Sequence, residues 1–236
     1  MKATLTVLTI LISILSFSQT KVYKSPNGKI LSQEEYKKAK ISSLENMKKM
    51  LGADYELYEK LEVSKKTNSS ILYSFEWEFL NEEMHAEKLV LEKLLGTKID
   101  FKNLNFLVHN EKNNVDYKKP TFVNFWFTTC PPCIEELPAL NELKNKYQDK
   151  INFVSITFDS SEKVEKFLTK YEFNFIHIVG EKDFINSHGF NGYPKTFLLD
   201  KNQILKSVTG SLPSKKDENA YNVQMKLMEE ALQKLL

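Results

Sequence analysis

From residue 121 onward, short apolar runs alternate with segments of helical pattern, and this alternation restricts the possible folds of the chain. Strands that alternate with helices form βαβ units, which give a largely parallel sheet. We predict strands at 121–127, 151–158, 175–179, 196–200 and 203–208, and helices at 134–147, 161–171, 181–188 and 218–236. The last two strands are joined by a turn at Lys201-Asn202 and add an antiparallel edge. The sequence therefore predicts an α/β fold with a central mixed sheet flanked by helices.

The chain has two cysteines, Cys130 and Cys133, and both follow the first of these strands at the start of the next helix. A C-x-x-C motif in this position is typical of thiol redox proteins. A helix N-terminus offers unpaired N–H groups that favour a thiolate. The Cys130 thiolate would attack a partner disulfide, and Cys133 would resolve the mixed disulfide. Pro131 and Pro132 fit the first helical turn, but each removes an N–H group that could stabilise the thiolate.

Other roles for the two cysteines fit the sequence less well. A disulfide between them closes a very short loop, so it would remove little chain entropy from the unfolded state. A structural zinc site usually needs four Cys or His ligands, and no His-x(3–5)-His pair accompanies the cysteines. An inert bridge remains an alternative. No organic cofactor is implied, because the dithiol itself carries the electrons.

Residues 1–18 have the pattern of a signal peptide. Lys2 precedes an apolar stretch at 5–17, and Ser16 and Ser18 suit cleavage before Gln19. The stretch is shorter than the roughly 18 residues expected of a spanning helix. We therefore predict export to the periplasm or cell envelope, with no stable membrane insertion after cleavage; an uncleaved anchor is the alternative. The net charge of +2 gives no indication of nucleic-acid binding.

Residues 19–95 are predicted to form an accessory region that is mostly helical. Asn27-Gly28 indicates a hairpin within 22–31, and a capping box at 32–35 indicates a helix that ends near Leu51. A strand at 71–79 and a helix at 82–95 should follow, while residues 53–70 have no clear pattern. The region carries no chemical motif.

Two segments resemble the TlpA/ResA-like (DsbE-like) thiol-disulfide oxidoreductases, the exported branch of the thioredoxin superfamily. The first is Asn124-Phe125-Trp126 with Cys130-Pro131-Pro132-Cys133, Glu136 and Pro138, and the second is 192-GYPKTFLLD-200. The resemblance covers residues 96–236 and implies a thioredoxin-like domain there. It also implies a cis peptide bond before Pro194.

The resemblance implies roles for individual residues. Cys130 would be the exposed nucleophile and Cys133 the resolving thiol, paired as a disulfide when oxidised. A partner would be contacted by six residues: Trp126, Thr129, Pro131, Pro132, Tyr193 and Pro194. Glu136 would be a catalytic carboxylate that relays a proton for Cys133. The equally weighted alternative is that Glu136 is a solvated carboxylate of the first helical turn.

The chain departs from the patterns of the proteins that it resembles at two positions. Asn124 stands where thioredoxins have a buried Asp, as it does in the TlpA branch, and it cannot act as a base. Thr129 stands where most relatives have Trp, which changes the docking face and therefore the choice of partner.

The preferred hypothesis is an exported thiol-disulfide oxidoreductase that reduces disulfides of specific envelope proteins. The preference for reduction comes from the resemblance, which also implies an upstream membrane thiol as electron donor. One alternative is a partner-binding module on a thioredoxin-like platform with non-catalytic thiols. A thiol-based metal carrier is a third hypothesis, against which the cis Pro194 expected from the resemblance argues.

Overall fold

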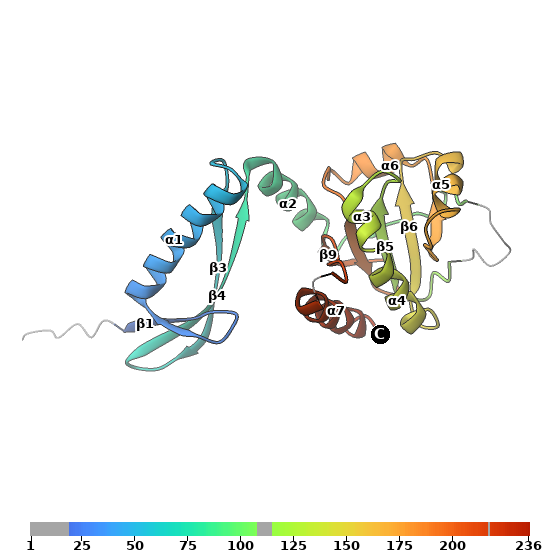
Figure 1. Cartoon of the computed structure of the whole chain (residues 1–236). Coiled ribbons are helices and arrows are strands. Elements are labelled where there is room, and N and C mark those ends of the chain that lie inside the picture. Colours follow the sequence, from blue (N-terminus) through green and yellow to red (C-terminus); the bar gives the residue numbers. More distant parts are fainter. Residues whose placement is uncertain (1–18, 108–114, 217) are drawn as a thin grey trace, which may run out of the picture. The chain divides into compact units, whose positions relative to one another are not determined.

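The computed structural model describes residues 19–107, 115–216 and 218–236, and it divides into two compact units, Met1–Glu83 and Met84–Leu236 (Figure 1). The predicted signal peptide at 1–18 lies outside the described residues. Within the described ranges, no helix combines the length and the hydropathy needed to cross a membrane.

The N-terminal unit is a four-stranded sheet with one helix along it, and its strands lie in the order β2-β1-β4-β3. Its elements are β1 (Thr20–Lys24), β2 (Ile30–Ser32), α1 (Gln33–Leu51), β3 (Glu56–Lys66) and β4 (Ser70–Leu80). The predicted hairpin, helix and strand are all present. The prediction of a mostly helical region is wrong, because residues 53–70 contain β3. This edge strand is largely exposed and rich in Lys and Glu, which protects the sheet edge but hides the strand pattern.

Local capping and a small aromatic core explain how this unit folds. Ser32 caps α1: the Glu35 N–H donates to Ser32 Oγ over 3.2 Å, and the Ser32 N–H donates to Glu35 Oε2 over 2.8 Å. Tyr36 of α1 stacks on Tyr23 of β1 with ring centroids 4.0 Å apart. Its hydroxyl oxygen accepts a hydrogen bond from Trp77 Nε1 over 3.0 Å. Tyr36 thus anchors α1 on the sheet, and the ion pairs Lys40–Glu59 and Lys48–Glu56 add contacts between α1 and β3.

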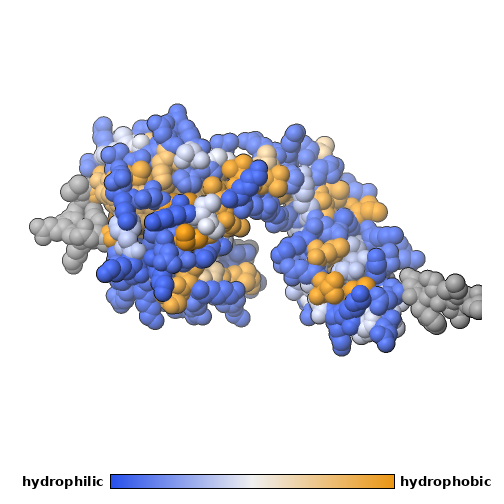
Figure 2. All heavy atoms as spheres, turned by 180° about the vertical axis from the view of Figure 1, so that it is seen from behind, coloured by the Kyte–Doolittle hydropathy of each residue, from blue (hydrophilic) through white to orange (hydrophobic). Residues whose placement is uncertain are grey.

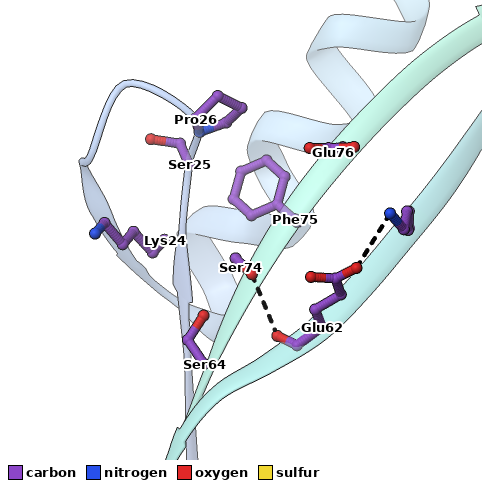
Figure 3. Close-up of a pocket in the computed structure, with 9 residues that line it drawn as sticks. Lys24, Ser25, Pro26, Glu62, Ser64, Ser74, Phe75 and Glu76 are labelled. Carbon is purple, nitrogen blue, oxygen red and sulfur yellow. Dashed lines mark hydrogen bonds and ion pairs between the residues drawn. The ribbon is translucent and has the colours of Figure 1, made fainter. Parts of the chain in front are cut away.

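A pocket of about 250 Å³ lies on the N-terminal unit (Figure 3). Its lining combines charges of both signs, including Lys60 and Glu62, which form an ion pair of 3.1 Å. Ser74 donates a 3.5 Å hydrogen bond to the carbonyl of Glu62, and both residues line the pocket.

On the face of the protein seen in Figure 2, hydrophobic patches are interspersed with larger hydrophilic areas.

The second unit is built on a five-stranded mixed sheet in the order β7-β6-β5-β8-β9. Strands β5, β6 and β7 are parallel, and β8 and β9 are antiparallel to their neighbours. The elements are α2 (Glu82–Leu94), β5 (Thr121–Trp126), α3 (Pro131–Glu135), α4 (Leu137–Tyr147), β6 (Asn152–Thr157), α5 (Ser161–Leu168), β7 (Ile176–Ile178), α6 (Lys182–Ser187), β8 (Lys195–Leu199), β9 (Leu205–Thr209) and α7 (Glu218–Gln233). The predicted α/β fold with a central mixed sheet is confirmed.

Hydrophobic clusters cover both faces of this sheet because alternate residues of β5 point to opposite sides. Phe122 and Trp126 belong to a cluster with side chains of α4, α5 and α7. Val123 and Phe125 belong to a second cluster with side chains of α2 and α6. All six residues of β5 are buried, as expected of a central parallel strand.

Helix α2 belongs to the second unit for most of its length. Leu91 is 7% exposed and is part of the second hydrophobic cluster. The division between the units falls at Glu83, whereas the predicted thioredoxin-like domain starts at residue 96. The structured unit thus includes a helix that precedes the recognisable motifs.

Candidate active site

The two cysteines lie where β5 gives way to α3. Cys130 is the N-cap of α3, and the Cys133 N–H donates to Cys130 Sγ over 3.3 Å. This is the first N–H group of the helix, because Pro131 and Pro132 have none. The two sulfur atoms form a disulfide with an S–S distance of 2.01 Å. The C-x-x-C spacing therefore places both sulfurs at the first turn of the helix.

Both cysteines are almost completely enclosed. Cys130 is 2% exposed and Cys133 is 1% exposed, and both belong to the cluster that contains Trp126. The expectation of an exposed Cys130 nucleophile is thus corrected for the oxidised protein. A partner disulfide must therefore reach a sulfur atom that the surrounding residues cover almost completely.

The helix is interrupted one turn after Cys133. Pro138 lies in the first turn of α4, where its missing N–H group costs no intrahelical hydrogen bond. Glu136 is both the C-cap residue of α3 and the N-cap residue of α4. The break places this carboxyl group between two short helices rather than on an outer helix face.

Glu136 is fully buried, at 0% exposure, which excludes the alternative of a solvated carboxylate. Its Oε1 accepts a hydrogen bond from Asn124 Nδ2 over 3.0 Å, and its Oε2 accepts one from the Leu212 N–H over 2.8 Å. Burial raises the pKa of Glu136 to about 7, although the hydrogen bonds from Leu212 and Asn124 act in the opposite direction. This carboxyl group can therefore gain or lose a proton near neutral pH.

A second carboxylate, Asp159, holds the loop between β5 and the cysteines, and the sequence analysis missed it. Its Oδ2 accepts hydrogen bonds from the Thr128 N–H over 2.7 Å and from Thr128 Oγ1 over 2.8 Å. Lys163 pairs with Oδ1 over 3.2 Å. Burial acts to raise the pKa of Asp159, but the bonds from Thr128 and Lys163 outweigh it and lower the pKa. The position of Asp159 in the sequence could have indicated this role. Asp159 follows β6, and the carboxyl end of β6 lies at the same edge of the sheet as that of the adjacent parallel strand β5.

The residues expected to touch a partner are divided between surface and core. Thr129, Pro131 and Pro132 are exposed, and Tyr193 is partly buried. The Tyr193-Pro194 peptide bond is cis, as the resemblance implied, and Pro194 is buried. Trp126 is 1% exposed and packs against Phe167 and Phe173, so its expected role as a partner contact is corrected to a core position.

Helix α2 holds the loop that leads to the cis proline. Glu87 pairs with Lys195 over 2.9 Å, with each side chain 15% exposed, and accepts a hydrogen bond from the Gly192 N–H over 3.3 Å. A Cβ atom at Gly189 would lie 2.7 Å from Val90, and this glycine has a φ of 67°. Sequence reasoning missed this contact because α2 lies about 100 residues away from the loop.

No group of three or more His, Cys, Asp and Glu side chains in the described ranges is placed to hold a metal ion. His177, a candidate by residue type, is fixed in the core by Ser155 Oγ at 2.6 Å and by the Phe173 carbonyl at 2.9 Å.

Comparisons with known proteins match this unit. The family model described as Redoxin matches residues 100–223. Thioredoxin-like protein YneN of Bacillus subtilis is 32% identical over 103 residues, which are 42% of this chain and 61% of YneN. Thiol-disulfide oxidoreductase ResA of Geobacillus thermodenitrificans is 34% identical over 114 residues, which are 46% of this chain and 66% of ResA. The crystal structure of the thioredoxin domain of a thiol-disulfide oxidoreductase from Bacteroides vulgatus has a TM-score of 0.45 and 22% identity, covering 56% of this chain and 96% of that chain.

Proposed function

Because this chain belongs to the Redoxin family, we propose that it is a thiol-disulfide oxidoreductase whose Cys130–Cys133 pair exchanges disulfides with partner proteins. The matched relatives bear out the resemblance to the TlpA/ResA-like branch of the thioredoxin superfamily. The observation that carries the proposal is the position of the Cys130–Cys133 bond at a helix start, one turn before the buried carboxyl of Glu136.

The reaction follows from the positions of the two sulfur atoms. In the reduced protein, the Cys130 thiolate attacks one sulfur of a partner disulfide, and the other sulfur leaves as a thiolate that takes up a proton. The Cys133 thiol loses its proton and attacks Cys130 Sγ, which breaks the mixed disulfide. The second partner sulfur leaves as a thiolate and takes up a proton, equivalent to the one that Cys133 released. The partner is then a dithiol and the protein retains the Cys130–Cys133 disulfide, so two electrons pass to the partner. The Cys133 N–H that points at Cys130 Sγ supports the thiolate in the first step.

Glu136 is proposed to handle the proton of Cys133. The two residues are three positions apart, so they lie on the same side of the helical turn. A group with a pKa of about 7 gains and loses protons readily at neutral pH. Asn124, which donates to Glu136, cannot itself act as a base, so it orients the carboxyl group rather than carrying the proton.

The direction, place and partners are parts of the same proposal. We favour reduction of specific protein disulfides, on the resemblance to the TlpA/ResA-like proteins. The signal-like pattern of residues 1–18 supports export to the periplasm or cell envelope. An exported reductase must be supplied with electrons, for which an upstream membrane thiol protein is the expected donor.

Two measurements on protein comprising residues 19–236 test the proposal. We expect Cys133→Ser to accumulate mixed disulfides with partner proteins, whereas Cys130→Ser, the matched control, accumulates none. Equal behaviour of the two variants would contradict the exchange mechanism. The equilibrium reduction potential then gives the direction: a value near −270 mV, as in thioredoxin, supports a reductase, and a value near −120 mV, as in DsbA, indicates a disulfide donor.

A further inference from the structure

Three aromatic rings from three separate loops meet beside the cysteines. We call Phe127, Phe158 and Tyr193 the aromatic platform. The ring centroids are 5.4 Å apart for Phe127 and Phe158, 5.4 Å for Phe127 and Tyr193, and 5.8 Å for Phe158 and Tyr193. Phe127 follows β5, Phe158 follows β6, and Tyr193 precedes the antiparallel strand β8. All three therefore lie at the same edge of the sheet, where the C-x-x-C motif also begins.

The platform has a fixed position relative to the reactive sulfur. The Cys130 N–H donates to the Phe127 carbonyl over 3.1 Å, which closes a turn between the ring and the cysteine. Tyr193 lies edge-on against Phe190, which is 2% exposed and packs on Phe125. The platform is thus supported by the core beneath it and does not depend on a partner to form.

The platform is also accessible. Phe158 is 39% exposed, and Phe127 and Tyr193 are partly exposed. Asp159, which follows Phe158, pairs with Lys163, and Glu87, whose charge acts on Tyr193, pairs with Lys195. An exposed aromatic surface next to neutralised carboxylates favours an apolar side chain over a charged one.

We propose that the aromatic platform binds a large apolar side chain, preferably aromatic, located next to the reactive cysteine of a partner protein. This inference rests on the proposed function, since it names the substrate class of the same site. When a cysteine of a partner protein bonds to Cys130, the residues on either side of that cysteine also lie close to the site, because consecutive Cα atoms are about 4 Å apart. Their side chains then lie over the adjoining surface, where aromatic rings pack in edge-on or offset arrangements. Thr129, the residue directly before Cys130, is exposed and has no ring, so Phe127, Phe158 and Tyr193 supply the aromatic surface beside it.

The test uses the pre-reduced protein in single turnover, so that no additional reductant is needed. Two peptides carry the same mixed disulfide and differ only in the residue next to the cysteine, which is Trp in one and Ser in the other. The release of each peptide thiol gives a rate constant per peptide concentration, and the ratio of the two constants is the readout. We expect the Trp peptide to react roughly ten- to hundredfold faster in the wild type.

Two variants locate the effect. Phe158→Ala should reduce the ratio toward one, because it removes the most exposed ring of the platform. Tyr171→Ala is the matched control, because Tyr171 is also an aromatic residue that is 40% exposed and stacks on another ring, that of Phe167. Tyr171 follows α5 in the chain, whereas Phe158 precedes α5. Helix α5 has eight residues and is therefore about 12 Å long, and the two residues lie at its opposite ends in the chain. Tyr171→Ala should retain the wild-type ratio.

The outcomes separate this inference from the proposed function. A wild-type ratio near one, with both peptides reacting, would overturn the aromatic preference and leave the oxidoreductase intact. An equal loss of preference in Phe158→Ala and Tyr171→Ala would also overturn it. If neither peptide reacts, the proposed function fails and this inference fails with it.

Discussion

The backbone N–H of Leu212 donates a 2.8 Å hydrogen bond to Glu136, so the carboxyl group next to the cysteines is held by the segment between β9 and α7. Asn124 of β5 holds the other carboxylate oxygen. The carboxyl group of Glu136 is thus held by β5, which precedes it in the chain, and by Leu212, which lies 76 residues after it. Glu136 is fully buried, and this burial raises its pKa to about 7.

The first prediction concerns the pH dependence of stability. The pKa of Glu136 is about 7 in the folded protein against an ordinary value of 4.5, so folding favours the protonated form. The stabilisation is complete below pH 4.5 and is lost as the pH rises to about 7. The difference corresponds to about 3 kcal/mol of unfolding free energy.

A Glu136→Gln variant isolates this contribution. Gln does not titrate, so urea unfolding of the oxidised variant should lack the loss of stability between pH 4.5 and 7.5 that the wild type shows. Gln presents an NH₂ group to one of the two donors, so we also expect a pH-independent cost of about 1–3 kcal/mol. Glu135→Gln, an exposed neighbour, should retain the wild-type pH dependence. Parallel profiles for wild type and Glu136→Gln would contradict the assigned pKa.

A second prediction concerns the loop in front of Cys130. Asp159→Ala leaves the Thr128 N–H and hydroxyl group without their acceptor, which should cost about 1–3 kcal/mol of stability and slow disulfide exchange. Asp159→Asn retains an oxygen acceptor and should recover part of both losses. Unfolding and single-turnover exchange, measured on the same samples, check this. Unchanged exchange in Asp159→Ala would show that the loop position does not depend on this carboxylate.

A third prediction tests whether α2 is part of the second unit. Leu91→Ala in the whole chain should destabilise that unit by about 2–5 kcal/mol, because Leu91 lies in the hydrophobic cluster behind β5. Leu89 is 45% exposed on the same helix, and Leu89→Ala should change stability by less than about 0.5 kcal/mol. Hydrogen exchange of the β5 amides reports this unit separately from the N-terminal one. Equal hydrogen-exchange rates of the β5 amides in Leu91→Ala and Leu89→Ala would mean that α2 does not stabilise the second unit.

A fourth prediction addresses the pair between Glu87 and Lys195. Both side chains are only 15% exposed, so removing one charge should cost about 1–3 kcal/mol, more than a surface ion pair contributes. A double-mutant cycle of Glu87→Gln and Lys195→Met measures the coupling from urea unfolding. A coupling energy near zero would mean that the hydrogen bond from Gly192, rather than the ion pair, holds the loop to α2.

Much of the fold follows from local patterns in the sequence. The α/β order of residues 121–236 and the capping box at Ser32 were predictable because dense apolar runs and N-cap chemistry act over a few residues. Strand β3 was not, because an edge strand with exposed Lys and Glu side chains has no clear apolar face. The break between α3 and α4 at Glu136 also escaped prediction, although Pro138 indicated it.

The sequence by itself determined the reactive pair, because the spacing of Cys130 and Cys133 at the start of a helix is a local property. It did not decide how the groups around that pair behave. The burial of Cys130 and Glu136, the acceptor role of Asp159 and the contact of α2 with the cis-proline loop depend on segments that are distant in the chain. Burial and hydrogen bonding determine the pKa of a carboxyl group, and only the tertiary structure sets either of them. For that reason the sequence left Glu136 equally balanced between a solvated and a catalytic carboxylate, and its burial with a hydrogen bond from the Leu212 N–H excluded the solvated one.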